Sequence, residues 1–80
     1  MAPLWEIEFT AEAKFYFIDS GDYTGNLLGE IELLRYYLDA LPPEDWTEVE
    51  PGLFRWEILN HLVYYRKRGK TIIIAVVKPL

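Results

Sequence analysis

Polar and apolar residues alternate near the N-terminus, where Glu6 and Glu8 separate the large apolar side chains. The apolar side chains of residues 4–9 that share one face are Trp5, Ile7 and Phe9. A period of two residues is typical of a strand with one face buried and the other in water. The pattern therefore predicts a half-buried strand over residues 4–9.

A short helix is expected after this strand. Thr10 is a suitable N-cap because its hydroxyl can accept a hydrogen bond from a free N–H of the first turn, and Glu12 adds a favourable negative charge there. We expect the helix to cover residues 11–18, with Phe15 and Ile18 facing the interior; the run of residues 15–18 would also suit a strand.

A helical period follows a segment, residues 19–26, that is rich in turn residues. The apolar positions of the new pattern are spaced by three and four residues: Leu27, Ile31, Leu34, Leu38 and Leu41. Such a stripe lies on one face of a helix and, at this length, is typical of a core helix rather than a coiled coil. We expect a helix over residues 27–41, capped by Asn26 or Thr24 and ended by Pro42–Pro43.

The rest of the chain has the composition and the turn signals of a sheet. The expected strands are Trp46–Glu50, a segment with Phe54, Trp56 and Ile58 on one face, Leu62–Arg66 and Thr71–Val77, and the expected turns are Pro51–Gly52, Leu59–Asn60 and Arg68–Gly69. The last strand is apolar on both faces, so we expect it to be central or covered.

Together these elements predict an α+β fold. An N-terminal strand and two helices precede an antiparallel meander of about three strands, with the helices on one face of the sheet. We expect the leucine-rich stripe to pack on the sheet face that carries Trp56 and Ile58.

Composition adds few constraints. The chain has 80 residues, of which 51% are hydrophobic and 16% aromatic, enough to build a core, and we expect one domain over residues 1–80. Cysteine is absent, which excludes disulfides and thiolate metal sites. A glycine-rich phosphate loop and a histidine pair are also missing, so we expect no cofactor and no metal. The longest apolar run, Ile72–Val77, is far shorter than the roughly 20 residues that span a bilayer, and the N-terminus has no signal-peptide pattern, so a cytoplasmic protein without a membrane partner is expected.

Charge is distributed unevenly along the chain. The net charge is −5, but residues 1–53 carry two cations against twelve acids, while residues 54–80 carry six cations against Glu57 alone. This segregation indicates either an acidic face and a basic face or a solvated surface without a role. Because the whole chain is acidic, any contact with nucleic acid has to be local.

Several short motifs in this order resemble the RelE/ParE family of toxins from bacterial type II toxin–antitoxin systems. Residues 5–13 are similar to the family's first strand and its "T-x-E-A", Gly52–Ile58 to its "G-x-[YF]-R-x-x-[IV]" strand, and Val63–Arg66 to its "V-x-Y-R". Thr71–Val77 stands where the family's last core strand runs. The resemblance implies a toxin-like component that acts on RNA or translation, contacts RNA or the ribosome, and is neutralised by an antitoxin protein.

The chain departs from the family at positions that RelE-type nucleases use. Leu62 stands where the family commonly has a second arginine, and Glu44–Glu50 is acidic where those nucleases carry a lysine pair. The chain also ends at Leu80 without the aromatic or histidine that such nucleases have beyond the last strand. Endoribonuclease activity therefore stays open, and a catalytically inactive toxin-fold protein that acts by protein–protein binding is the alternative.

Two residues are candidate catalytic groups, Arg55 and His61. Cleavage of RNA needs a base, an acid and cations that stabilise the phosphorane. Arg55 can contact a phosphate through two N–H groups, or it can form an ordinary surface ion pair. His61 is the sole histidine and titrates near neutrality, but at an expected turn without a partner an exposed polar role is the simpler interpretation.

The hairpin near the C-terminus supplies candidate contacts for RNA or a partner protein. Tyr64 and Tyr65 are adjacent, so on a strand one faces the core and the other is free to stack on a base or a side chain. Residues 66–70 place four cations around a tight turn, where solvation, phosphate contact and docking of an acidic segment all remain open. The predicted binding residues are Arg55, Tyr65, Arg66, Arg68 and Lys70.

Overall fold

The first strand and the first helix are joined by a residue that serves both. The computed structural model describes residues 2–21 and 25–80. Strand β1 (Glu6–Phe9) leads directly into helix α1 (Ala11–Ser20), and Thr10 is the N-cap, as predicted. The Thr10 hydroxyl accepts from the Ala13 N–H at 3.3 Å and donates to the Ala75 carbonyl at 2.7 Å. One side chain thus satisfies the helix terminus and ties it to the distant strand that contains Ala75.

The inward face of α1 differs from the prediction. Ala13 is fully buried, and Tyr16 and Phe17 pack against the core, whereas Phe15 and Ile18 are 65% and 74% exposed. Residues 15–18 are all apolar or aromatic, so periodicity alone does not select a face. The edge-to-face contact of Phe17 with the ring of Phe9, 5.7 Å between centroids, accompanies the observed rotation.

The second helix begins close to the expected position. Helix α2 covers Gly25–Glu32, so Asn26 lies inside the helix and does not cap it. Thr24, the other expected cap, lies outside the described residues, as does the middle of the predicted turn 19–26. A short 3₁₀ helix, η2 (Leu33–Tyr36), continues α2. Leu27, Ile31 and Leu34 of the predicted stripe are buried.

The end of this helix was predicted incorrectly. The helical region stops at Tyr36, well before the two prolines, and Leu38 is 80% exposed. Backbone donors of the N-terminal segment bind the last turn, since the Leu4 and Trp5 N–H groups donate to the Arg35 carbonyl at 2.7 and 3.2 Å. The Trp5 indole also donates to the Tyr37 carbonyl at 2.9 Å. These tertiary hydrogen bonds take carbonyls that a longer helix would use itself.

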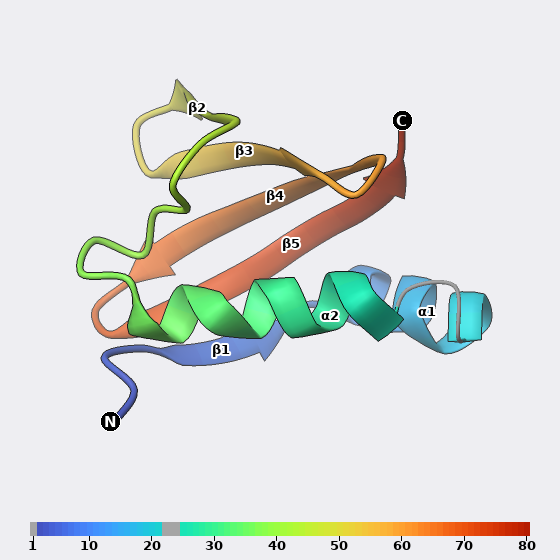
Figure 1. Ribbon diagram of the computed structural model, residues 1–80, viewed down its shortest axis with the longest axis horizontal. Helices are drawn as coiled ribbons and strands as arrows, with labels where there is room; N and C mark the ends of the chain where they lie inside the picture. Colours follow the sequence, from blue (N-terminus) through green and yellow to red (C-terminus); the bar gives the residue numbers. More distant parts are fainter. Residues whose placement is uncertain (1, 22–24) are drawn as a thin grey trace.

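Five strands form one sheet in the order β1-β5-β4-β3-β2 (Figure 1). The strands that follow the helices are β2 (Trp46–Glu50), β3 (Leu53–Ile58), β4 (His61–Arg68) and β5 (Thr71–Pro79). They pair as an antiparallel meander of four strands, and β1 pairs with β5 in parallel. The apolar strand β5 lies between β1 and β4, which confirms its expected central position.

A two-residue turn fixes the register between β3 and β4. Leu59 and Asn60 both have positive φ, 50° and 62°, as a type I′ hairpin requires. Ile58 therefore pairs with His61, and Arg55 lies opposite Tyr64. Side chains alternate between the two sheet faces from these pairs outward.

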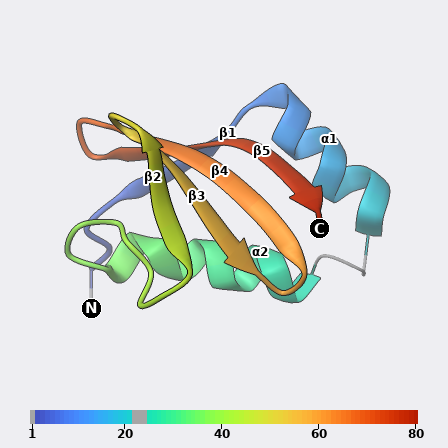
Figure 2. The same cartoon turned by 90° about the horizontal axis from the view of Figure 1, so that it is seen from above.

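Both helices pack on the same sheet face. Leu27, Ile31 and Leu34 form one buried cluster with inward residues of the sheet, among them Phe54 and Trp56, and Ile58 packs against it. The predicted contact between the helical stripe and this face is confirmed for Leu27, Ile31 and Leu34 but not for Leu38, which is exposed. Figures 1 and 2 show α2 along one side of the sheet and α1 near the C-terminal end of β5. Among the described residues, no helix covers the opposite face.

Candidate functional site

Cations gather around one tyrosine on the uncovered sheet face. Arg55 and Tyr64 are direct cross-strand partners, and alternation along β4 places Arg66 and Arg68 on the same face. Lys78 of β5 pairs with Leu62 of β4, and the Lys78 Nζ lies 5.6 Å from the centre of the Tyr64 ring. We call this set the basic face: Arg55, Tyr64, Arg66, Arg68 and Lys78.

Half-buried aliphatic side chains lie between these cations. Tyr64 pairs with Val76 and Arg66 pairs with Ile73 across β4 and β5, and both aliphatic residues are only partly exposed. The basic face is thus an amphipathic surface with an aromatic centre, aliphatic neighbours and guanidinium and ammonium groups. Such a composition suits recognition of an acidic, partly apolar segment or of stacked bases with phosphates.

Tyr65 is not available for binding, contrary to the prediction. Its side chain is fully buried on the covered face, stacks on the Phe54 ring at 5.5 Å between centroids, and donates its hydroxyl to the Ala40 carbonyl at 2.8 Å. Burial raises the pKa of the Tyr65 phenol well above its ordinary value. Tyr65 is therefore a core residue, and Tyr64 is the tyrosine of the pair that reaches the surface.

His61 is buried rather than exposed at a turn. It is the first residue of β4, is 2% exposed, and its Nδ1 lies 2.7 Å from the Leu59 carbonyl. Because a carbonyl only accepts, Nδ1 donates to it, and Nε2 shares a hydrogen bond of 2.7 Å with the Tyr16 hydroxyl. The ring thus links α1 to the sheet and has a partner on both nitrogens.

The two candidate catalytic residues are not brought together. Arg55 shares a face with Tyr64, whereas His61 shares the covered face with Val63 and Trp56. An imidazole on the far side of the sheet has no access to a phosphate held by Arg55. Within the part of the chain that the structure describes, Arg55 and His61 therefore do not form one site that combines a cation with an acid–base group.

Arg55 also has acidic neighbours, at the end of the basic face nearest β2. With Thr47, its partner on β2, it lines a shallow pocket of about 230 Å³ that Asp45 and Glu57 also line. Carboxylates beside a guanidinium lower the local positive potential that a phosphate would need. With these carboxylates beside it, Arg55 is poorly placed to stabilise a phosphorane.

The cations of the β4–β5 hairpin divide between the two faces. Arg66 forms an exposed ion pair with Glu50 at 3.2 Å, which leaves most of its donors free. Lys67 points to the covered side, where its Nζ donates to the Asp39 carbonyl at 2.8 Å and lies 5.0 Å from the centre of the Phe54 ring. Lys70 is exposed at the turn itself. Arg66 and Arg68 therefore belong to the basic face, while Lys67 has a structural role.

Two members of the basic face, Tyr64 and Lys78, were absent from the predicted binding residues. A signal for Tyr64 was present in the sequence, because a two-residue turn at Leu59–Asn60 places the residue four positions after Asn60 opposite Arg55. The position of Lys78 depends on a register shift, since Ala75 is left without a partner between the Tyr64 and Tyr65 pairs. Nothing in the sequence marks that bulge.

No helix within residues 2–21 and 25–80 is long and apolar enough to cross a membrane. No family model and no curated protein sequence matches this chain. A solved structure described as "Chromosomal ParDE TA system from P. aeruginosa" superposes with a TM-score of 0.70 at 12% sequence identity, covering 96% of this chain and 97% of that one. The chain therefore has the RelE/ParE-like toxin fold that its motifs predicted.

Proposed function

We propose that this protein is the toxin-like component of a bacterial toxin–antitoxin pair, located in the cytoplasm, and that it acts by binding a protein rather than by cleaving RNA. The fold supports the toxin-like role. The observation that carries the binding mechanism is the separation of Arg55 from His61 onto opposite sheet faces, combined with the carboxylates beside Arg55. A cleavage site would need these groups on one side.

The partner is an antitoxin whose docking segment is acidic and partly apolar. Arginine and tyrosine dominate the energetics of many protein interfaces, and the basic face presents Arg55, Arg66, Arg68 and Tyr64 together. Long-range attraction between unlike charges speeds association and weakens as salt shortens the screening length to about 8 Å. We expect the association rate to fall as ionic strength rises.

The test is association with the product of the neighbouring reading frame, measured at low and high salt. The variant Arg66→Gln/Arg68→Gln should lower the association rate at least severalfold, whereas the matched control Lys14→Gln/Arg35→Gln, which removes the same charge from the acidic half of the chain, should leave it nearly unchanged. A rate that depends on neither salt nor Arg66 and Arg68 would contradict the role of the basic face.

Action on RNA or translation is the second candidate, favoured by the Tyr64 ring among cations. Under the binding proposal, expression of the chain alone causes weak growth arrest or none. Strong arrest that is abolished by Arg55→Ala, with an unchanged circular dichroism spectrum, would refute the binding mechanism. It would make Arg55 a catalytic residue of an endoribonuclease.

A further inference from the structure

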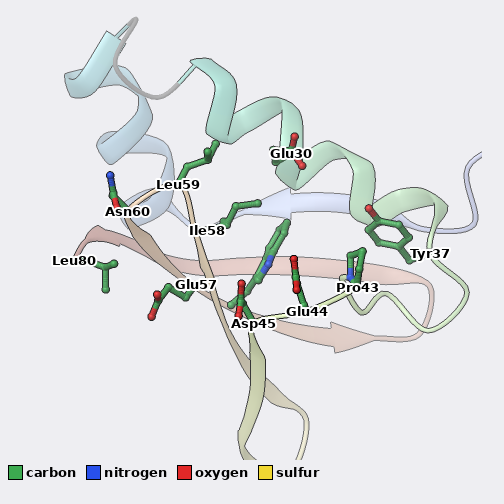
Figure 3. A pocket seen from close by; sticks show the side chains of 11 residues that line it. Glu30, Tyr37, Pro43, Glu44, Asp45, Glu57, Ile58, Leu59, Asn60 and Leu80 are labelled. Atoms are coloured by element: carbon green, nitrogen blue, oxygen red, sulfur yellow. The ribbon is translucent and has the colours of Figure 1, made fainter.

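A groove of about 590 Å³ opens beside β3 and the segment before β2 (Figure 3). Asp45 and Glu57 line both this groove and the pocket beside Arg55. The walls of the groove are α2, the connection from η2 to β2, and β3 with the turn that follows it. The groove is therefore built by elements that the fold holds in place, and none of the residues assigned to the basic face lines it.

Four carboxylates from three separate elements border this groove. Glu30 comes from α2, Glu44 and Asp45 from the segment before β2, and Glu57 from β3 (Figure 3). No lysine or arginine lines the groove, and none of the four carboxylates forms an ion pair with another described residue. Concave walls focus such a negative potential and raise the local concentration of cations.

The floor of the groove holds an unused hydrogen-bond donor. Trp56 is 4% exposed and lines the groove, and its indole N–H donates to no atom of the described residues. No fully enclosed side-chain nitrogen or oxygen of the described chain lacks a partner, so this N–H is not sealed in the core. The Trp56 N–H is therefore accessible from the groove that Trp56 lines. A donor held there favours a ligand that brings a hydrogen-bond acceptor.

We propose that this groove binds a basic segment of a partner polypeptide. Lysine or arginine side chains meet the carboxylates, their aliphatic stems pack against Tyr37 and Ile58, and a backbone carbonyl of the segment accepts from the Trp56 indole. A metal ion is a poor fit, because the described residues contain no group of three ligands suited to one. The inference deepens the proposed function: the partner would contact the basic face with an acidic segment and this groove with a basic one.

The experiment titrates the ¹⁵N-labelled chain with a blocked peptide, acetyl-Lys-Leu-Arg-Leu-Lys-Ala-amide, and follows the indole N–H resonances. Trp56→Phe assigns the Trp56 signal, and that signal should shift more than those of Trp5 and Trp46. Raising the salt concentration should weaken binding, and the acidic peptide acetyl-Glu-Leu-Asp-Leu-Glu-Ala-amide should cause no shift.

Matched variants separate the groove from general electrostatics. Glu44→Gln/Asp45→Asn/Glu57→Gln should weaken peptide binding about tenfold. Asparagine suits position 45 because the φ of Asp45 is 64°. The control Glu6→Gln/Glu8→Gln/Glu12→Gln removes the same number of exposed acids from β1, at the opposite edge of the sheet, and from the first turn of α1, and should change binding less than twofold.

Each outcome decides the inference. Absence of the Trp56 shift, or equal weakening by the groove variant and the control, overturns it. A Trp56 shift that grows with protein concentration without peptide assigns the groove to a second copy of the chain and also overturns it. The proposed function fails separately, because it is tested by Arg66→Gln/Arg68→Gln and the neighbouring gene product, while the groove is tested with peptide alone.

Discussion

Removing one hydroxyl from the core, by Tyr65→Phe, should destabilise the protein by about 1–3 kcal/mol. Tyr65 and Ala40 are both fully buried, and the hydroxyl donates to the Ala40 carbonyl at 2.8 Å. Phenylalanine keeps the ring and its stack on Phe54, so the change isolates the hydrogen bond and leaves a buried carbonyl without its partner. Urea unfolding at neutral pH, with an unchanged slope, measures the loss as a lower midpoint.

The same residue predicts how stability depends on alkaline pH. Burial raises the pKa of Tyr65 in the folded protein, so below about pH 10 the phenol is protonated in both states and its contribution is complete. Above that value the unfolded chain releases the proton while the folded chain retains it. The free energy of unfolding then falls by up to about 1.4 kcal/mol per pH unit. The stability of Tyr65→Phe should fall less steeply with pH. Equal alkaline slopes would refute the raised pKa of the buried phenol, and equal midpoints at neutral pH would refute the buried hydrogen bond.

Two further predictions concern the helix and the β3–β4 turn. Leu34→Ala should lower the free energy of unfolding by about 2–5 kcal/mol because Leu34 is fully buried. Leu38→Ala should change it by less than about 0.5 kcal/mol because Leu38 is 80% exposed. Similar losses for the two variants in urea unfolding would contradict the observed end of the helix. Leu59→Asn should stabilise the protein by about 0.5–1 kcal/mol, since leucine at a φ of 50° is strained and asparagine tolerates that conformation; a lower thermal midpoint would disprove it.

The strands and the order of elements were predictable because local chemistry determines them. β-Branched and aromatic residues separated by turn signals define β3, β4 and β5 within a few residues of their observed ends. The N-cap at Thr10 follows equally from its position after a strand and from its hydroxyl. These features need no knowledge of distant residues.

The features that sequence did not predict depend on contacts between distant residues. The helix ends at Tyr36 because the backbone of residues 4–5 binds the Arg35 carbonyl and the Trp5 indole binds the Tyr37 carbonyl. In α1, Tyr16 faces inward, where the run of apolar residues allowed several faces. The site required more than motifs. The strand that contains Arg55 was predicted correctly, but the burial of Tyr65 and His61 depends on cross-strand register and on Ala40 and Tyr16.

The parallel pairing of β1 with β5 has a consequence for the synthesis of the chain. β5 pairs with β1 on one side and with β4 on the other. The Thr10 hydroxyl donates to the carbonyl of Ala75, which lies 65 positions later in the chain. Until β5 leaves the ribosome, β1 lacks the strand with which it pairs and α1 lacks the strand to which Thr10 attaches it. The final folding step therefore comes late and depends on non-local contacts. Once β5 has left the ribosome, its apolar side chains stay exposed until β1 and β4 pair with it, which makes β5 the segment most prone to aggregation at that stage. A protein that recognises the basic face cannot bind a nascent chain, because that face does not exist until β4 and β5 have paired.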